Sequence, residues 1–146
     1  MPSINRYRRV VPATFVDITG TPTGDISDIQ IWQDGNQLQV TETNGTPGLR
    51  FTFTFVGVTS ILRLFVMGYY NGSATHHLDI QMWNYTTSAW DQFCAMMTAN
   101  DSQQFVCEVF DDTDYISGGA SQVRFDHHVA GNNSHNVYLD YIALLY

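Results

Sequence analysis

The chain has 146 residues, with six basic residues, 14 acidic residues and a formal net charge of −8. This length is typical of one domain that buries a sizeable core. All six basic residues are arginine, and such an acidic, lysine-free chain excludes nucleic-acid binding across its surface. An aromatic share of 14% favours β-structure over a helical bundle.

The N-terminus is basic and has no apolar leader. Three of the six arginines, Arg6, Arg8 and Arg9, lie in the first ten residues. We interpret residues 1–9 as an arm that docks onto an acidic protein surface, or else as a solvated terminus, and residues 10–146 as one domain. A signal peptide needs an apolar run of about 7–15 residues and a membrane span roughly 20, and neither is present. We therefore expect a protein made in a cytoplasm.

The first half of the chain alternates apolar and polar residues, which predicts strands. The predicted strands are residues 10–18, 28–33, 37–42, 49–56 and 60–70. Pro12 suits a strand start or an edge position. The sequence Asp34-Gly35-Asn36 between the second and third strands predicts a hairpin, with Trp32 on its outer side.

The second half continues the pattern, with predicted strands at residues 76–85, 89–97, 103–110, 121–129 and 137–145. We expect Trp90 to point into the core. The last strand is apolar on both faces, which indicates a strand covered on both sides. The turn-forming run at residues 130–136 predicts that Val129 faces Val137 across a hairpin, which would place Asp126 opposite Asp140.

About nine to ten short strands separated by turns predict an all-β fold, an antiparallel β-sandwich of jelly-roll type. The stretches LDIQMWNYTTSAWDQF and YISGGASQVRFDHHVAGNNSHNVYLDYIALLY resemble the second half of carbohydrate-binding modules. They also resemble the capsid decoration and tail accessory proteins of tailed bacteriophages. The resemblance covers roughly residues 76–146, contains no catalytic motif, and implies a fold more directly than a function.

The two cysteines are placed by the predicted turn at residues 100–101. A hairpin there makes Cys94 and Cys107 direct cross-strand neighbours. A disulfide between such neighbours is geometrically feasible but strained, and synthesis in a cytoplasm favours free thiols packed as small apolar groups. We therefore expect reduced cysteines.

Five histidines suggest a metal site. The adjacent pairs at 76–77 and 127–128 point to opposite faces of their strands, so neither pair can hold one ion by itself. A better cluster is Asp126, His128 and His135. Since Asp126 is also predicted opposite Asp140, a cation or the nearby Arg124 would relieve the repulsion between the two carboxylates.

The resemblance to carbohydrate-binding modules implies one further metal. Many such modules hold a structural calcium ion near an aspartate of the last strand. Asp140 occupies a comparable place in this chain, and Asp17 is a conceivable partner. The alternative is that Asp140 is a hydrogen-bonded surface aspartate. No other cofactor is expected.

Aromatic residues on outer faces carry the main functional hint. Trp83 and Tyr85 share a predicted strand face with Asp79 and Gln81, and Trp32 lies among glutamines. Flat aromatic rings beside amides suit sugar rings, although the same surface suits a protein interface or cover by a loop.

No catalytic motif is present: we find no nucleophile elbow, phosphate loop or zinc-binding spacing. The sequence therefore predicts a non-enzymatic virion structural protein, either a bacteriophage capsid decoration protein or a tail accessory protein. It would self-associate, bind capsid or tail proteins of its particle, and need neither nucleic acid nor a membrane. The alternative is a carbohydrate-binding module that recognises a glycan through Trp32, Trp83 and Tyr85.

Overall fold

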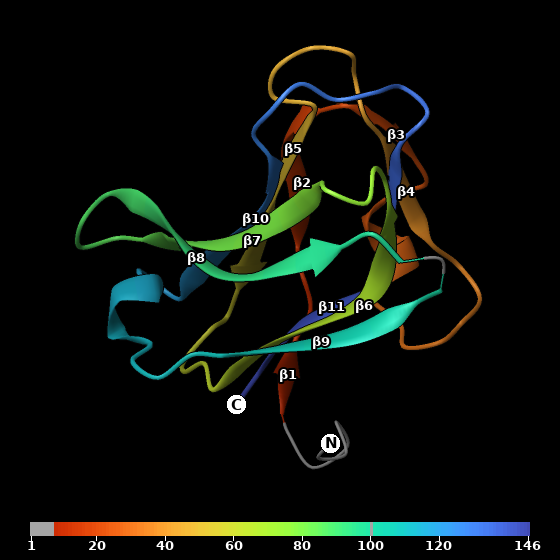
Figure 1. Cartoon of the computed structure of the whole chain (residues 1–146). Coiled ribbons are helices and arrows are strands. Elements are labelled where there is room, and N and C mark those ends of the chain that lie inside the picture. Colours follow the sequence, from red (N-terminus) through yellow and green to blue (C-terminus); the bar gives the residue numbers. More distant parts are fainter. Residues whose placement is uncertain (1–7, 100) are drawn as a thin grey trace.

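The computed structural model describes residues 8–99 and 101–146 and shows two antiparallel sheets packed face to face (Figure 1). The five-stranded sheet has the order β2 (Thr14–Thr19), β5 (Leu49–Val56), β10 (Ala120–His127), β7 (His77–Asn84) and β8 (Ala89–Met97). The six-stranded sheet has the order β3 (Thr21–Thr23), β4 (Leu38–Thr41), β11 (Asn136–Leu145), β6 (Arg63–Asn71) and β9 (Gln103–Glu108). Its sixth strand, β1 (Arg9–Val10), pairs with the end of β11. The predicted β-sandwich is confirmed, with eleven strands among the described residues.

The core lies between the sheets and is built from the apolar residues that alternate along the strands. In β5, Phe51, Phe53 and Phe55 are fully buried, and Phe51 stacks on Phe125 of β10 with 5.1 Å between the ring centroids. Burial of one such side chain contributes about 1.5–3 kcal/mol. The strand pattern at residues 49–56 therefore fixes which face of the five-stranded sheet is free to carry polar groups.

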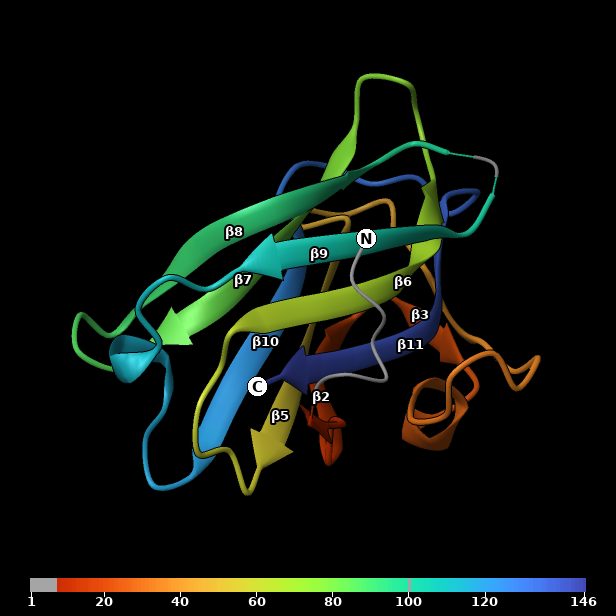
Figure 2. The ribbon, with the colours of Figure 1, turned by 90° about the horizontal axis from the view of Figure 1, so that it is seen from below.

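The last strand has the central position that its sequence indicates. β11 pairs with β4 on one side and β6 on the other, and most of its residues are buried. Figure 2 shows β11 running beside β6. The predicted hairpin before it is wrong, because β10 belongs to the opposite sheet. Asp126 consequently lies beside Arg50 and Asp79 rather than opposite Asp140.

The predicted hairpin at residues 28–42 is also wrong. Its first half contains a short 3₁₀ helix, η2 (Ile26–Ile29), which begins with a capping box. The Asp25 carboxylate accepts the Ser27 backbone N–H at 2.8 Å, and the Asp28 carboxylate accepts the Asp25 N–H at 2.8 Å. These local acceptors compete with strand pairing, so only β4 forms in this region.

A disulfide joins Cys94 of β8 to Cys107 of β9, contrary to the expected free thiols. The two strands do not form a hairpin. β8 is the edge of the five-stranded sheet and β9 the edge of the six-stranded sheet, so the bond links the two layers along one side of the sandwich.

The N-terminal arm is described only from Arg8. The Arg8 N–H donates to the Tyr146 carbonyl at 3.0 Å, and the Tyr146 N–H donates to the Arg8 carbonyl at 2.9 Å. Arg8 and Arg9 are exposed beside the last strand, whereas Arg6 lies outside the described residues. In the part of the chain that the structure describes, no helix is long and apolar enough to cross a membrane.

Candidate functional site

The outer face of the five-stranded sheet carries a row of aromatic and planar polar side chains. Leu78, Ile80 and Met82 of β7 are fully buried, so the alternation of the strand turns Gln81 and Trp83 outward. Trp83 pairs across the β7–β8 hairpin with Trp90, with 5.3 Å between their ring centroids. We call this surface the outer aromatic face.

Arg124 of β10 joins the aromatic and polar parts of this face. Its guanidinium lies 4.5 Å from the centroid of the Trp90 ring, and its Nε donates to Gln81 Oε1 at 2.8 Å. Burial lowers the pKa of Arg124, and the neighbouring Asp126 carboxylate acts in the opposite direction. The guanidinium is held by a cation–π contact and a hydrogen bond, which fix the positions of Gln81 and Trp90 relative to each other.

A second arginine fixes the carboxylate at the centre of the face. Arg50 of β5 donates two hydrogen bonds to Asp126, from Nε to Oδ1 at 2.9 Å and from a terminal nitrogen to Oδ2 at 3.2 Å. Asp126 is 4% exposed in its side chain. The formal charges of Arg50 and Arg124 are balanced by Asp126 and Asp79, so the face has no excess charge when its histidines are neutral.

The Arg50–Asp126 pair should contribute measurably to stability. We expect Asp126→Asn to lower the free energy of unfolding by about 1–3 kcal/mol, because it removes one acceptor from a largely buried bidentate contact. A matched control is Glu108→Gln, whose partner is Arg63 at 2.7 Å but whose side chain is 47% exposed. Such a surface pair contributes about 0–1 kcal/mol. Urea unfolding compares the two variants, and equal losses would contradict the assignment.

The structure separates the residues that were predicted to form one aromatic surface. Asp79, Gln81 and Trp83 share the outer side of β7. Tyr85 follows the end of β7 and is half-buried. Its backbone N–H donates to the Asp114 carbonyl at 2.7 Å. Trp32 packs on the opposite sheet, with 5.1 Å to the Phe65 ring centroid, and therefore does not belong to the outer aromatic face.

The prediction that Trp90 lies in the core is wrong. Trp90 is half-buried on the outer face beside Trp83. The length of the turn decides its face: the structure turns at residues 85–88, which sets Trp90 opposite Trp83, and directly paired residues share a face. The predicted strand bounds leave a turn of residues 86–88, which would set Trp90 opposite Asn84 instead. Arg124 could not be placed in this way, because its contact with β7 is not a hairpin contact.

A second polar cluster lies at one end of the sandwich around Glu42, which follows β4 and has no exposed side-chain area. Its Oε1 accepts the Tyr70 hydroxyl and lies 2.8 Å from His127 Nδ1. Its Oε2 accepts the Asn132 backbone N–H at 2.9 Å and lies 3.2 Å from His135 Nδ1. One buried carboxylate thus accepts hydrogen bonds from Tyr70 and Asn132 and lies beside two imidazoles, all from distant parts of the chain.

Burial has opposite effects on two of these donors. It raises the pKa of the Tyr70 hydroxyl far above its usual range, and the adjacent Glu42 carboxylate adds to that shift. Burial lowers the pKa of His127, although Glu42 acts in the opposite direction. Tyr70 therefore remains a neutral donor to Glu42, and the environment favours neutral imidazole at His127.

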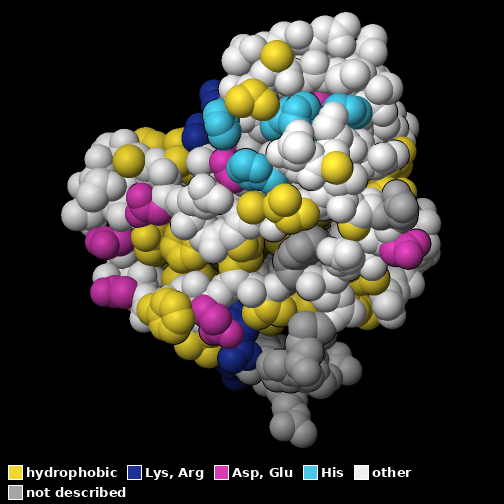
Figure 3. All heavy atoms as spheres, viewed as in Figure 1, with side chains coloured by type: hydrophobic (Ala, Val, Ile, Leu, Met, Phe, Trp, Pro, Cys, Tyr) yellow, Lys and Arg dark blue, Asp and Glu magenta, His cyan; other side chains and the backbone are white. Residues whose placement is uncertain are grey.

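All five histidines gather at this end of the molecule (Figure 3). β7 begins beside the end of β10, so the two adjacent pairs align across the strands. His76 faces His127 with 4.8 Å between ring centroids, and His77 faces His128 at 6.4 Å. The two histidines of each adjacent pair point to opposite faces, as predicted. Each of these four histidines instead has a histidine of the neighbouring strand as its ring neighbour.

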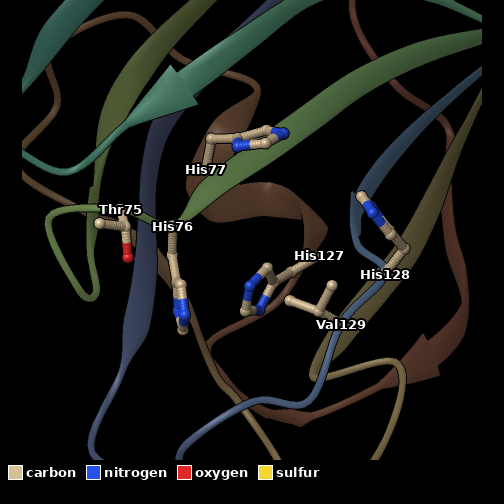
Figure 4. A pocket seen from close by; sticks show the side chains of 6 residues that line it. All are labelled: Thr75, His76, His77, His127, His128 and Val129. Carbon is tan, nitrogen blue, oxygen red and sulfur yellow. The ribbon is translucent and has the colours of Figure 1, made fainter.

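A pocket of about 300 Å³ opens between these pairs. It is lined by Thr75, His76, His77, His127, His128 and Val129 (Figure 4). The outward histidines share Asp79, whose Oδ1 lies 3.1 Å from His77 Nε2 and whose Oδ2 lies 3.6 Å from His128 Nδ1.

The predicted metal clusters are not assembled. Asp126 is held by Arg50, and His128 and His135 contact different carboxylates, Asp79 and Glu42. Among the described residues, no three His, Cys, Asp or Glu side chains are placed to hold one metal ion.

The two other predicted calcium ligands also lie apart from Asp126. Asp140 belongs to the opposite sheet, where the Gln33 backbone N–H donates to it and burial raises its pKa. Asp17 is exposed at an irregularity of β2, with a φ of 55°. The structure therefore does not bring Asp17, Asp126 and Asp140 together.

No family model and no curated protein match the chain by sequence. Solved structures with a similar fold do exist. A family 29 carbohydrate-binding module superposes with a TM-score of 0.58 at 11% identity, covering 94% of this chain and 89% of that chain.

Two variants of a family 29 module, solved as complexes, are similar as well. One, with mannohexaose, gives a TM-score of 0.53 at 12% identity and covers 92% of this chain and 93% of its own. The other, with cellulohexaose, gives 0.54 at 11% and covers 92% of each chain. At such identities the likeness shows the shared β-sandwich fold, which confirms the resemblance to carbohydrate-binding modules.

Proposed function

We propose that this chain is a non-catalytic carbohydrate-binding module that binds hexose oligosaccharides on its outer aromatic face. The observation that carries the proposal is the row formed by Trp83, Trp90, Arg124 and Gln81 on one sheet surface. Indole rings pack on the apolar faces of sugar rings, and the amide and guanidinium groups donate to hydroxyls. The fold shared with modules that were solved with mannohexaose and cellulohexaose supports this class of ligand.

The charge balance of the face supports a neutral glycan. Both arginines are engaged with Asp126 or Gln81, and Asp79 is engaged by Gln92 at 3.0 Å. A uronate or sulfated chain would need an unpaired positive charge, whereas a neutral hexose chain needs the fixed hydrogen-bonding groups that these contacts provide.

The disulfide between Cys94 and Cys107 supports the same function. Disulfides persist in oxidising compartments and are rare in a reducing cytoplasm. A cross-linked sandwich therefore suits an oxidising setting better than it suits a protein assembled in a host cytoplasm. The virion reading stays a prediction: neither the solved structures named above nor the contacts of Arg8 and Arg9 favour it.

The test compares two tryptophans on opposite sheets. Isothermal titration with cellulohexaose and mannohexaose, after a glycan array, is expected to show binding by the natural chain. Trp83→Ala should weaken that binding by at least about fivefold, since loss of one aromatic anchor costs more than about 1 kcal/mol. Trp32→Ala should leave affinity unchanged, because Trp32 packs against the other sheet.

Two results would contradict the proposal. The first is absence of binding to any glycan on a broad array by a folded, oxidised protein. The second is an equal loss of affinity in the Trp32 and Trp83 variants, which would show that the effect is not local to the outer aromatic face. Melting temperatures of both variants control for loss of fold.

A further inference from the structure

The pocket between the two histidine pairs contains buried polar atoms that nothing in the described chain satisfies. We call it the histidine pocket. His127 lines it and is 2% exposed in its side chain, and its Nε2 has no hydrogen-bond partner among the described residues. The Nδ1 of His76, which faces His127 across the pocket in Figure 4, is likewise buried and without a partner in that part of the chain. Burial of a polar group without a hydrogen bond costs free energy, so these nitrogens indicate a ligand from outside the chain.

The chemistry of these nitrogens favours a neutral ligand that carries hydroxyl groups. Burial lowers the pKa of His127, which favours neutral imidazole. A neutral imidazole has one donor nitrogen and one acceptor nitrogen, and a hydroxyl group can pair with either. An anionic ligand would be repelled by two carboxylates, since Asp79 lies 3.1 Å from His77 and Glu42 lies 2.8 Å from His127.

The pocket has the size of a site for one small ring and ends inside the protein. Its volume of about 300 Å³ lies at the lower end of the range for small-molecule sites. His77 and His128 stand at the entrance, with side chains that are 42% and 57% exposed, whereas His127 closes the inner end. Val129, which is 43% exposed, gives the pocket an apolar wall. Because the inner end is a buried side chain, a polymer that enters the pocket must end there.

One row of outward side chains on β7 leads from the outer aromatic face to this entrance. Its members, in order toward the pocket, are Trp83, Gln81, Asp79 and His77. β10 is paired with β7 along this row, so the sheet surface is continuous. A strand rises about 3.3 Å per residue, so the six residues from Trp83 to His77 span about 20 Å, which is the length scale of a short oligosaccharide.

We propose that the histidine pocket binds the terminal hexose of an oligosaccharide that lies along the outer aromatic face, so that the protein recognises the end of a glycan chain. His76 and His127 exchange hydrogen bonds with hydroxyls of this last sugar, and Val129 packs against its ring. The inference rests on the proposed function, which supplies the position of the rest of the glycan. It adds a polarity to the site, because a glycan that continued past its last contact would need a groove open at both ends.

The first experiment fills the pocket entrance from an exposed position. Cellulohexaose and mannohexaose are titrated by calorimetry into the natural chain, Val129→Trp, His76→Ala and the control Leu62→Trp. Leu62 is 53% exposed and precedes β6 of the other sheet. We expect binding at least about fivefold weaker in Val129→Trp and in His76→Ala, because the terminal sugar loses its site, and unchanged binding in Leu62→Trp. Melting temperatures control for loss of fold.

Two further measurements address the chain end directly. Saturating hexaose should shift the ¹⁵N signals of the His76 and His127 imidazoles in the natural chain. A soluble linear polymer of the hexose that binds, with a known mean chain length, should saturate at one protein per polymer chain, because each chain offers one end of a given kind.

Three results would overturn the inference and leave the proposed function in place. One is hexaose binding that requires Trp83 but is equal in Val129→Trp, His76→Ala and the natural chain. Another is the absence of any imidazole shift at saturation, which would mean that the pocket holds water only. The third is many protein molecules on each polymer chain, which would show recognition of the glycan interior. Absence of hexaose binding by the folded natural chain would instead contradict the proposed function itself.

Discussion

Replacing Glu42 by alanine is expected to lower the free energy of unfolding by about 3–5 kcal/mol. The substitution removes the shared acceptor of the Tyr70 hydroxyl, the Asn132 N–H and two imidazoles, and it opens a cavity at a site without exposed area. Each donor left unpaired in the interior costs about 1–3 kcal/mol, offset in part by removal of a buried charge. For a chain of this size the melting temperature should fall by roughly 10 °C.

Tyr70→Phe is a milder substitution in the same cluster. It removes the Tyr70 hydroxyl and leaves the other contacts of Glu42 in place, so we expect a loss of about 1–2 kcal/mol. A double-mutant cycle with Glu42→Ala, measured by urea unfolding, should show that the Tyr70 effect disappears once Glu42 is absent. A loss below about 1 kcal/mol in Glu42→Ala would mean that water replaces the carboxylate, and that the cluster does not hold this end of the sandwich.

Local patterns predicted single strands well. The strands at residues 49–56 and 89–97 have the predicted bounds, because period-two alternation is a property of one segment and of the face it buries. The last strand is apolar on both faces, and this pattern indicated a strand covered on both sides. The structure places it between β4 and β6, inside its sheet.

Pairing between strands was predicted less well. A turn signal says that the chain bends, but not whether it returns to the same sheet. The chain crosses to the opposite sheet after β10 and again after β8, and both predicted hairpins failed there. The Asp34-Gly35-Asn36 signal failed for another reason: the Asp34 carboxylate accepts the Asn36 N–H at 3.0 Å and closes a local turn outside any hairpin.

The buried cluster was not predicted at all. Glu42 takes donors that lie 28, 90 and 93 residues away, and no spacing in the sequence connects them. The adjacent histidine pairs did suggest that each member faces away from its neighbour. What the sequence could not show is that β7 and β10 lie side by side, which brings His76 to His127 and His77 to His128.

Removing the disulfide by the double substitution Cys94→Ala and Cys107→Ala is expected to cost on the order of 3 kcal/mol. The two cysteines are 13 residues apart, and the bond closes this loop in the unfolded chain, which loses conformational entropy. Reduction of the natural chain should reproduce the loss in urea unfolding. Two alkylatable thiols in the unreduced protein, by intact mass, would contradict the bond itself.

The same variant should weaken glycan binding by a few-fold, because Cys94 lies in β8 four residues after Trp90. β8 pairs only with β7 inside its sheet, and the disulfide is its covalent tie to the other layer. An edge strand that loses this tie opens locally more often, so the Trp90 ring spends less time beside Trp83 and Arg124. Calorimetry with cellulohexaose at matched folded fractions measures the effect, and unchanged affinity would show that the β7–β8 hairpin alone holds the aromatic row.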